Sequence, residues 1–123
     1  MLEVTELHAH YGRAHILHGV TLAAGEGEVL ALLGRNGAGK STTLKAIMGV
    51  VRPTSGTVRF EGRELAGQES FEIARAGLGY VPEERRVFAE LTVAENLEVG
   101  RKVPLDGRAA WTPERLYALF PSL

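Results

Sequence analysis

Hydrophobic and polar residues alternate over two stretches near the start of the chain. A near-alternating pattern over residues 2–11 predicts a half-buried strand that ends at Tyr11-Gly12. Residues 16–24 predict a second strand, followed by a turn at Gly25-Glu26-Gly27, and residues 57–60 predict a third. These stretches together indicate a sheet with one face toward a core.

Two short runs are apolar throughout rather than alternating. Val29–Leu33 and Leu78–Val81 each have the length of a strand and no polar position, which is typical of strands covered on both faces. Pro82 ends the second run, because proline cannot donate a ladder hydrogen bond. Both runs are therefore predicted to be buried strands.

Capping and stop residues mark the helices. Four are predicted: residues 40–50, stopped by Gly49; 70–76, with Ser70 as N-cap; one from Thr92, which forms a capping box with Glu95; and one from Thr112-Pro113 over residues 116–120. Strands and helices mix along the chain, so the fold class is α/β.

Composition excludes several classes of protein. The 123 residues are 45% hydrophobic and 24% charged, ordinary values for a soluble globular chain. The net charge of −1 gives no electrostatic footprint for nucleic acid or an anionic membrane. Cysteine is absent, which excludes disulfides and cysteine-based metal sites. No apolar run approaches the roughly 20 residues of a membrane-spanning helix, so we expect any membrane role to come through a partner.

A glycine-rich motif follows the first apolar run. Residues 34–41 read GRNGAGKS, a full match to the phosphate-binding pattern G-x-x-x-x-G-K-[ST], with a predicted strand before it and a predicted helix after it. Gly34, Gly37 and Gly39 lack Cβ atoms, so the backbone can approach phosphate oxygens and point its N–H groups inward, with Asn36 and Ala38 in the same loop.

The residues that close the motif supply charge and hydroxyl groups. Lys40 is expected to bridge the β- and γ-phosphates, and the Ser41 hydroxyl to ligate Mg²⁺. Thr42 and Thr43 can add donors to the α- and β-phosphates, at the positive end of the helix. The sequence therefore predicts a site for the phosphates of a nucleoside triphosphate, with Mg·ATP as the ligand.

Other motifs around this loop resemble those of one family. They are Tyr11-Gly12, GEVLALLGRNGAGKSTTLKAIMGV at 27–50, PTSGTV at 53–58, FEG at 60–62, GLGYVPEERRVF at 77–88 and LTVAENL at 91–97. Over essentially its whole length the chain resembles the ATP-binding subunits of ABC transporters, and most of all those of branched-chain amino-acid importers. The resemblance implies a P-loop NTPase fold: an ABC-type nucleotide-binding domain with an N-terminal antiparallel β subdomain, truncated before the full parallel sheet is complete.

The resemblance also assigns residues and partners. Tyr11 matches the residue that stacks on adenine, and Glu83 stands where most of the family has a glutamine that contacts Mg²⁺ and the attacking water. Residues 1–90 would form the nucleotide-binding portion, and residues 91–123 the start of the helical subdomain. The partners implied are a second ATP-binding subunit and transmembrane permease subunits contacted between Glu83 and Leu97, with no nucleic acid. The expected location is cytoplasmic, on the inner face of the membrane.

Several parts of the ABC machinery do not occur in the 123 residues. After Ser41 no apolar strand ends in Asp-Glu, no LSGGQ-like loop follows, and no later switch histidine is present. We therefore expect the chain to resemble the N-terminal half of a subunit, to bind ATP with negligible turnover, and to expose apolar sheet edges.

Three alternatives to a transport ATPase remain open. They are a non-catalytic nucleotide-binding or regulatory fragment, a soluble ABC ATPase of translation or DNA repair, and a GTPase or small-molecule kinase. The last lacks support because no D-x-x-G follows the loop. The importer-like segment 91–97 and the absence of a basic face argue against the second.

Four histidines lie within eleven residues, at His8, His10, His15 and His18. His8 and His10 share one face of the predicted strand, an arrangement that a metal site can use. No cysteine or carboxylate completes an obvious ligand set, so we interpret them as surface histidines.

Overall fold

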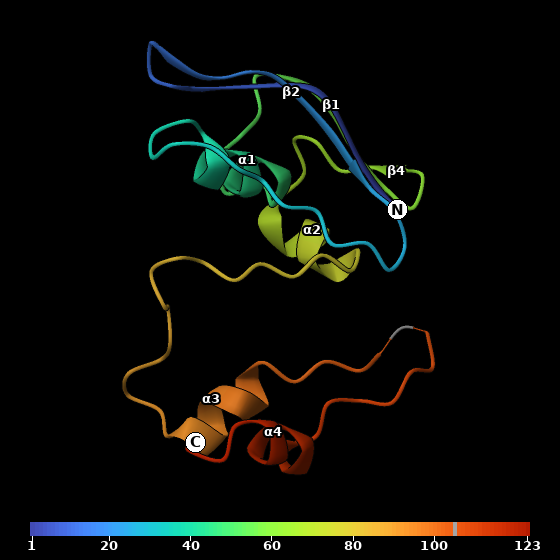
Figure 1. Cartoon of the computed structure of the whole chain (residues 1–123), viewed down its shortest axis with the longest axis vertical. Helices are drawn as coiled ribbons and strands as arrows, with labels where there is room; N and C mark the ends of the chain where they lie inside the picture. The colour runs from blue at the N-terminus through green and yellow to red at the C-terminus, as the bar shows by residue number, and fades with distance from the viewer. Residues whose placement is uncertain (105) are drawn as a thin grey trace. The chain divides into compact units, whose positions relative to one another are not determined.

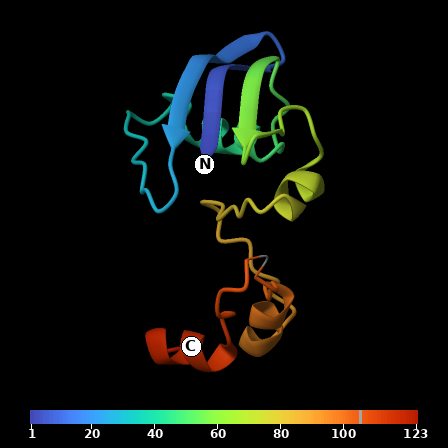
Figure 2. The same cartoon turned by 90° about the vertical axis from the view of Figure 1, so that its right-hand side faces the viewer.

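The computed structural model describes residues 1–104 and 106–123, which divide into two compact units, Met1–Tyr80 and Val81–Leu123. The first unit is built on an antiparallel sheet in the order β2-β1-β3-β4 (Figures 1 and 2). Its strands are β1 (Leu2–Tyr11), β2 (Ala14–Ala24), β3 (Ser55–Phe60) and β4 (Arg63–Glu64). The strands predicted at residues 2–11, 16–24 and 57–60 are confirmed, whereas the two-residue β4 was not predicted because it is too short to carry a pattern.

One face of this sheet carries the core of the first unit. Helix α1 (Lys40–Ile47) packs on it and lies behind the sheet in Figure 2. Alternation places apolar side chains of each strand on that face, where they are excluded from water. The core comprises Val4, Leu7 and Ala9 from β1, Leu17 from β2, Val58 from β3, Ala46, Ile47 and Met48 from α1 and its end, and Leu65 and Ile73.

Helix α1 ends earlier than the predicted residue 50. Gly49 adopts a left-handed φ of 72°, and the amide of Val50 bonds to the carbonyl of Lys45 at 2.9 Å. This pattern satisfies the last carbonyls of the helix and reverses the chain, a function that glycine performs without a Cβ clash. The stop signal was therefore identified correctly, and the helix ends one turn before the predicted boundary.

Helix α2 (Ser70–Arg75) has a different cap from the predicted one. Its N-cap is Glu69, and the carboxylate of Glu72 accepts a bond from the Glu69 amide at 3.3 Å. Ser70 is the first helical residue instead. The prediction of Ser70 as N-cap is wrong because the glutamate pair sets the capping box one residue earlier.

The two predicted buried strands do not form within the described residues. Val29 and Leu33 are 98% and 88% exposed, and Val81 is 93% exposed. Neither segment belongs to a ladder, since the described pairings join only β1 to β2, β1 to β3, and β3 to β4. A strand needs a neighbour for its backbone N–H and C=O groups, and apolar composition alone does not supply one. These two predictions are therefore wrong for this structure.

The second unit contains helices α3 (Val93–Val99) and α4 (Pro113–Leu119), shown in Figure 1. The predicted capping box is confirmed: Thr92 Oγ1 accepts from the Glu95 amide at 3.2 Å, and Glu95 accepts from the Thr92 amide at 2.7 Å. Thr112 Oγ1 caps α4 by accepting from the Arg115 amide at 3.3 Å.

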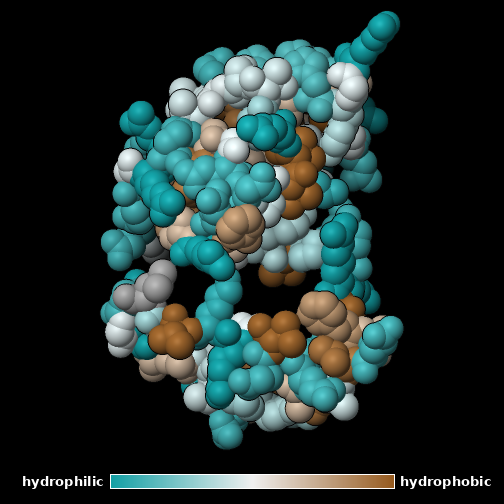
Figure 3. Space-filling model, turned by 180° about the vertical axis from the view of Figure 1, so that it is seen from behind, coloured by the Kyte–Doolittle hydropathy of each residue, from teal (hydrophilic) through white to brown (hydrophobic). Residues whose placement is uncertain are grey.

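Apolar side chains reach the surface of both units, as the brown areas of Figure 3 show. In the second unit they include Val87, Phe88, Trp111 and Phe120, all more than half exposed. Among the described residues, none of the helices has the length and hydrophobicity required to span a bilayer.

Candidate functional site

The glycine-rich loop leads directly into α1. Its N-cap is Gly39, with φ 90° and ψ 10°, and Gly37 also has a positive φ of 85°. A left-handed glycine followed by right-handed helical residues turns successive N–H groups to one side and forms an anion-binding concavity. The helix begins at Lys40, so its unsatisfied N–H groups face the same loop. Gly37 and Gly39 therefore have the backbone dihedrals for which the motif needs glycine.

Gly39 is also the point at which the loop contacts the sheet. A Cβ on Gly39 would lie 2.9 Å from Leu17 Cδ2, a separation that Cβ atoms essentially do not reach. Leu17 is buried in the core and belongs to β2. A side chain at this position would meet both a strained φ and the buried Leu17 side chain, so glycine is favoured here on two grounds. Sequence reasoning did not single out Leu17, although its place on the apolar face of the strand indicated a buried side chain.

Lys40 folds back over the loop that precedes it. Its Nζ donates to the carbonyl oxygen of Gly34 and, at 2.9 Å, to that of Arg35. The Arg35 carbonyl also accepts the amide of Ala38 at 3.0 Å, which closes a turn inside the loop. The ammonium group therefore lies within the loop, where it adds a positive charge to the concavity formed by the backbone.

Hydroxyl groups follow the lysine on the first turn of α1. Thr43 is buried, and its Oγ1 donates to the Gly39 carbonyl at 2.8 Å, the same oxygen that accepts the Thr43 amide. This use of its hydroxyl fixes the start of the helix. Ser41 is exposed and Thr42 half-buried on that turn, while Asn36 and Ala38 lie in the exposed part of the loop.

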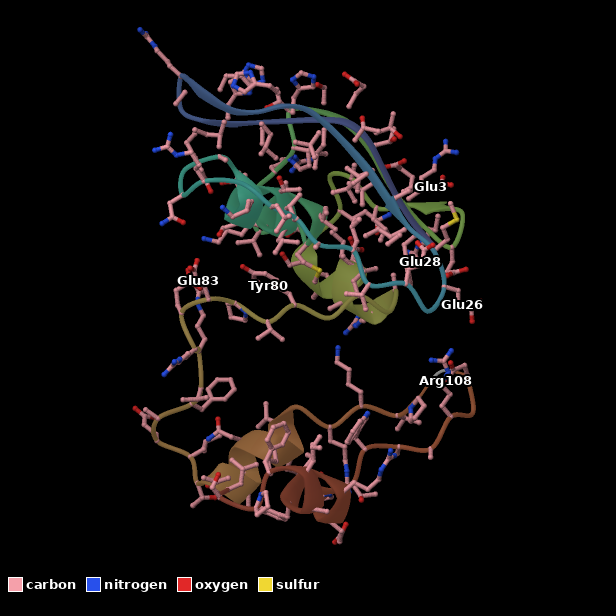
Figure 4. All side chains as sticks on the ribbon, viewed as in Figure 1. Glu3, Glu26, Glu28, Tyr80, Glu83 and Arg108 are labelled. Carbon is pink, nitrogen blue, oxygen red and sulfur yellow. The ribbon has the colours of Figure 1, made fainter. Side chains whose placement is uncertain are left out.

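The two remaining predicted site residues lie on other segments. Tyr11 ends β1, pairs with Ala14 across the hairpin and is 48% exposed. Glu83 belongs to the second unit, and Figure 4 shows its side chain projecting from the segment after Val81. The predicted strand that would carry Glu83 is absent, so the first unit brings together the loop, α1 and the β1–β2 hairpin but not Glu83.

Asn96 organises the segment before α3 and was missed by the sequence analysis. Its Oδ1 accepts the Phe88 amide at 2.9 Å, and its Nδ2 donates to the carbonyls of Phe88, Leu91 and Thr92 at 2.9–3.2 Å. One amide side chain thus fixes residues 88–92. Only its position in the LTVAENL segment could have pointed to it.

The four histidines lie on β1 and β2, where three are exposed and His8 is half-buried. Among residues 1–104 and 106–123, no three histidine, aspartate or glutamate side chains form a set that could hold a metal ion. We describe this histidine cluster further below.

Comparison with known proteins identifies relatives of the chain. The family model described as ABC transporter matches residues 17–121. The chain is 45% identical over 100 residues to the high-affinity branched-chain amino acid transport ATP-binding protein BraG of Pseudomonas aeruginosa, with 81% of this chain and 43% of BraG covered. It is 38% identical over 111 residues to the ribose import ATP-binding protein RbsA of Halalkalibacterium halodurans, with 90% and 22% covered.

A solved structure gives the same result for the fold. The chain superposes with a TM-score of 0.73 and 26% identity on a dimeric post-hydrolysis ATP-binding cassette bound to ADP and Pi, with 98% of this chain and 55% of that one covered. The α/β fold of an ATP-binding cassette with an antiparallel β subdomain is thereby shown. The chain spans less than half the length of the two curated relatives.

Proposed function

Because the chain belongs to the ABC transporter family, we propose that it binds the phosphates of Mg·ATP in the loop of residues 34–41. The position of Lys40 carries this proposal. An ammonium group has three N–H donors, so it can hold the Gly34 and Arg35 carbonyls and still donate to a phosphate oxygen. The loop and lysine then need little rearrangement when the ligand binds, which lowers the cost of binding.

The roles proposed for the other residues come from the family resemblance and fit their chemistry. The Ser41 hydroxyl is a hard oxygen of the kind that Mg²⁺ prefers, and the Glu83 carboxylate is a donor of the same kind. Tyr11 offers an exposed aromatic face for stacking on adenine. Gly34, Gly37, Gly39, Asn36, Ala38, Thr42 and Thr43 line the same loop and helix start.

In the complete protein we propose that ATP hydrolysis drives transport across a membrane. The similarity to BraG favours import of branched-chain amino acids, whereas RbsA is named for ribose, so solute choice belongs to the proposal. The dimeric cassette among the similar structures supports pairing with a second ATP-binding subunit. The permease contact would be the segment from Glu83 to Leu97, within which Asn96 holds residues 88–92. The complete protein would then lie on the cytoplasmic face of the membrane. Residues 1–90 would then be the nucleotide-binding portion and 91–123 the start of the helical subdomain.

The experiment that tests ATP binding uses thermal unfolding of the 123-residue chain. Mg·ATP and Mg·GTP are titrated into the wild type, Lys40→Ala and Lys45→Ala; the last removes the same charge from the last turn of α1. Ligand at about 100 times its dissociation constant stabilises by roughly 2.7 kcal/mol, a shift of several degrees. We expect a Mg²⁺-dependent shift in the wild type and in Lys45→Ala, and none in Lys40→Ala.

Two results would contradict the proposal. A shift of equal size in Lys40→Ala would mean that nucleotide binds elsewhere, and no shift in a wild type that unfolds cooperatively would mean that the loop does not bind phosphate. Steady-state ATP turnover by this chain above that of Lys40→Ala would separately contradict our expectation that it binds without hydrolysis.

A further inference from the structure

Four imidazole rings lie against one another on the β1–β2 hairpin. His8 is the cross-strand partner of His18, and His10 is the partner of His15. His15 is the centre of the cluster: its ring centroid lies 5.2 Å from that of His8, 4.2 Å from that of His10 and 3.9 Å from that of His18. The histidine cluster, defined as these four residues, therefore joins the two strands beside the hairpin turn.

One contact in the histidine cluster depends on protonation. His8 Nδ1 and His15 Nε2 lie 3.0 Å apart, and a hydrogen bond between them needs one donor and one acceptor. A neutral imidazole has one of each, whereas an imidazolium has two donors. The pair can therefore hold its bond with no added proton or with one. With two added protons, two N–H groups oppose each other and the bond is lost.

The neighbouring groups respond differently. His10 Nδ1 lies 2.8 Å from Thr54 Oγ1, and a hydroxyl can donate to a neutral ring or accept from a charged one, so this contact survives protonation. A carboxylate also lies near the cluster: Glu6 Oε2 is 4.0 Å from His8 Nε2. A positive charge on His8 is compatible with Glu6, but it disfavours a second positive charge on His15.

We propose that the histidine cluster makes the β1–β2 hairpin sensitive to pH, so that the hairpin is held closed by neutral imidazoles and loosens as the cluster takes up protons in mildly acidic solution. The proposed nucleotide site uses none of these four histidines. Their contacts link β1, β2 and, through Thr54, the segment before β3. Loosening is expected first at the end of the hairpin, around Gly12, where β1 has only β2 as a neighbour because the described β1–β3 pairing ends at His8.

The electrostatics of His15 agree with this. Although His15 is exposed as a residue, desolvation lowers its pKa below 6.5, and positive charges on His18 and His10 lower the pKa further. The unfolded hairpin then binds more protons than the folded one between the two pKa values. Stability is therefore present above pH 6.5 and is lost as the pH falls from there through the folded pKa.

For nucleotide binding the consequence rests on the proposed function. Tyr11 ends the same hairpin, one residue beyond His10, so a loosened hairpin would hold the adenine-stacking ring less well. The affinity for Mg·ATP would then fall more steeply with acid in the wild type than in a chain without the central histidine.

The test follows amide hydrogen exchange in the full chain at pH 7.5 and 5.5, expressed as protection factors so that intrinsic exchange cancels. Where the folded hairpin binds one proton fewer than the unfolded hairpin, the protection factor falls tenfold for each pH unit of acidification. In the wild type we expect the protection factors of residues 9–17 to fall severalfold from pH 7.5 to pH 5.5. In His15→Gln, which keeps a polar side chain, we expect no such fall. Arg59→Gln, a charge change on β3 away from the cluster, should behave as the wild type.

A second measurement keeps the proposal testable if His15→Gln fails to fold. The imidazole Cε1–H signal of His15 in the wild type should titrate with a midpoint below 6.5. A midpoint at or above 6.5, or equal loss of protection in wild type and His15→Gln, would overturn the proposal. Failure of Mg·ATP to bind at pH 7.5 would instead overturn the proposed function, because the exchange and titration measurements contain no nucleotide.

Discussion

Replacement of Gly39 by alanine tests whether the loop is positioned by its contact with the sheet. Gly39 has φ 90°, and an added Cβ would lie 2.9 Å from Leu17 Cδ2 in the core. Gly37 is the matched control, because its φ is 85° and an added Cβ would meet no atom within 4 Å. The two variants thus share the backbone strain and differ in the packing clash.

The magnitude follows from these two effects. A left-handed alanine costs about 1–2 kcal/mol relative to glycine, and overpacking a buried site costs about 1–3 kcal/mol. We therefore expect Gly39→Ala to lower the free energy of unfolding by about 2–5 kcal/mol and Gly37→Ala by about 1–2 kcal/mol. The reduced entropy of the unfolded chain offsets both by the same amount, so the difference of about 1–3 kcal/mol measures the Leu17 contact.

Equilibrium unfolding in urea without nucleotide provides the assay. The one tryptophan is Trp111, which lies in the second unit, so the first unit must be followed by far-ultraviolet circular dichroism or by amide exchange. Equal destabilisation by the two variants would refute the reasoning. It would mean that Leu17 moves aside at no cost and does not position the loop.

Two further pairs of variants test other parts of the structure. Gly56→Ala should destabilise the first unit by about 2–6 kcal/mol, because the added Cβ would lie 2.3 Å from the backbone oxygen of Glu6. Gly62→Ala is the control: its Cβ would meet no atom within 4 Å, so it should destabilise by about 1–2 kcal/mol. Urea unfolding compares the two variants, and similar losses of stability would count against the close approach of β3 to the Glu6 backbone. Thr92→Ala should remove the cap of α3 and cost about 1 kcal/mol in local stability, read as faster amide exchange in that helix, while Thr92→Ser should retain protection. Unchanged exchange in Thr92→Ala would mean that the capping bond contributes little.

Much of the first unit could be predicted because its signals are local. Alternation identified β1 and β2, and the glycine-rich motif identified the loop and the start of α1, since the required dihedrals and donors come from the residues themselves. Capping residues identified α3 and α4 for the same reason. The Gly39 contact with Leu17 joins distant residues, and no pattern within either segment indicates it.

The two wrong strand predictions share a physical cause. The apolar composition of residues 29–33 indicates that burial of these side chains is favourable. A strand also needs a neighbouring backbone to pair with, and the segment itself does not encode that neighbour. The histidine cluster is similar: spacing suggested that His8 and His10 share a face, whereas the central position of His15 depends on the register of β1 against β2. Interactions that depend on pairing lie beyond what a local pattern can predict.

The absence of a strand at residues 29–33 bears on how the loop acquires its shape. The glycine dihedrals, the turn closed by the Arg35 carbonyl and the bonds from Lys40 are all present although the preceding segment pairs with nothing among the described residues. The loop is instead anchored on its other side, where Gly39 lies against Leu17 and α1 buries Ala46 and Ile47 on the sheet. In this structure the loop therefore takes its conformation from its packing against the antiparallel sheet and α1, without strand pairing of residues 29–33.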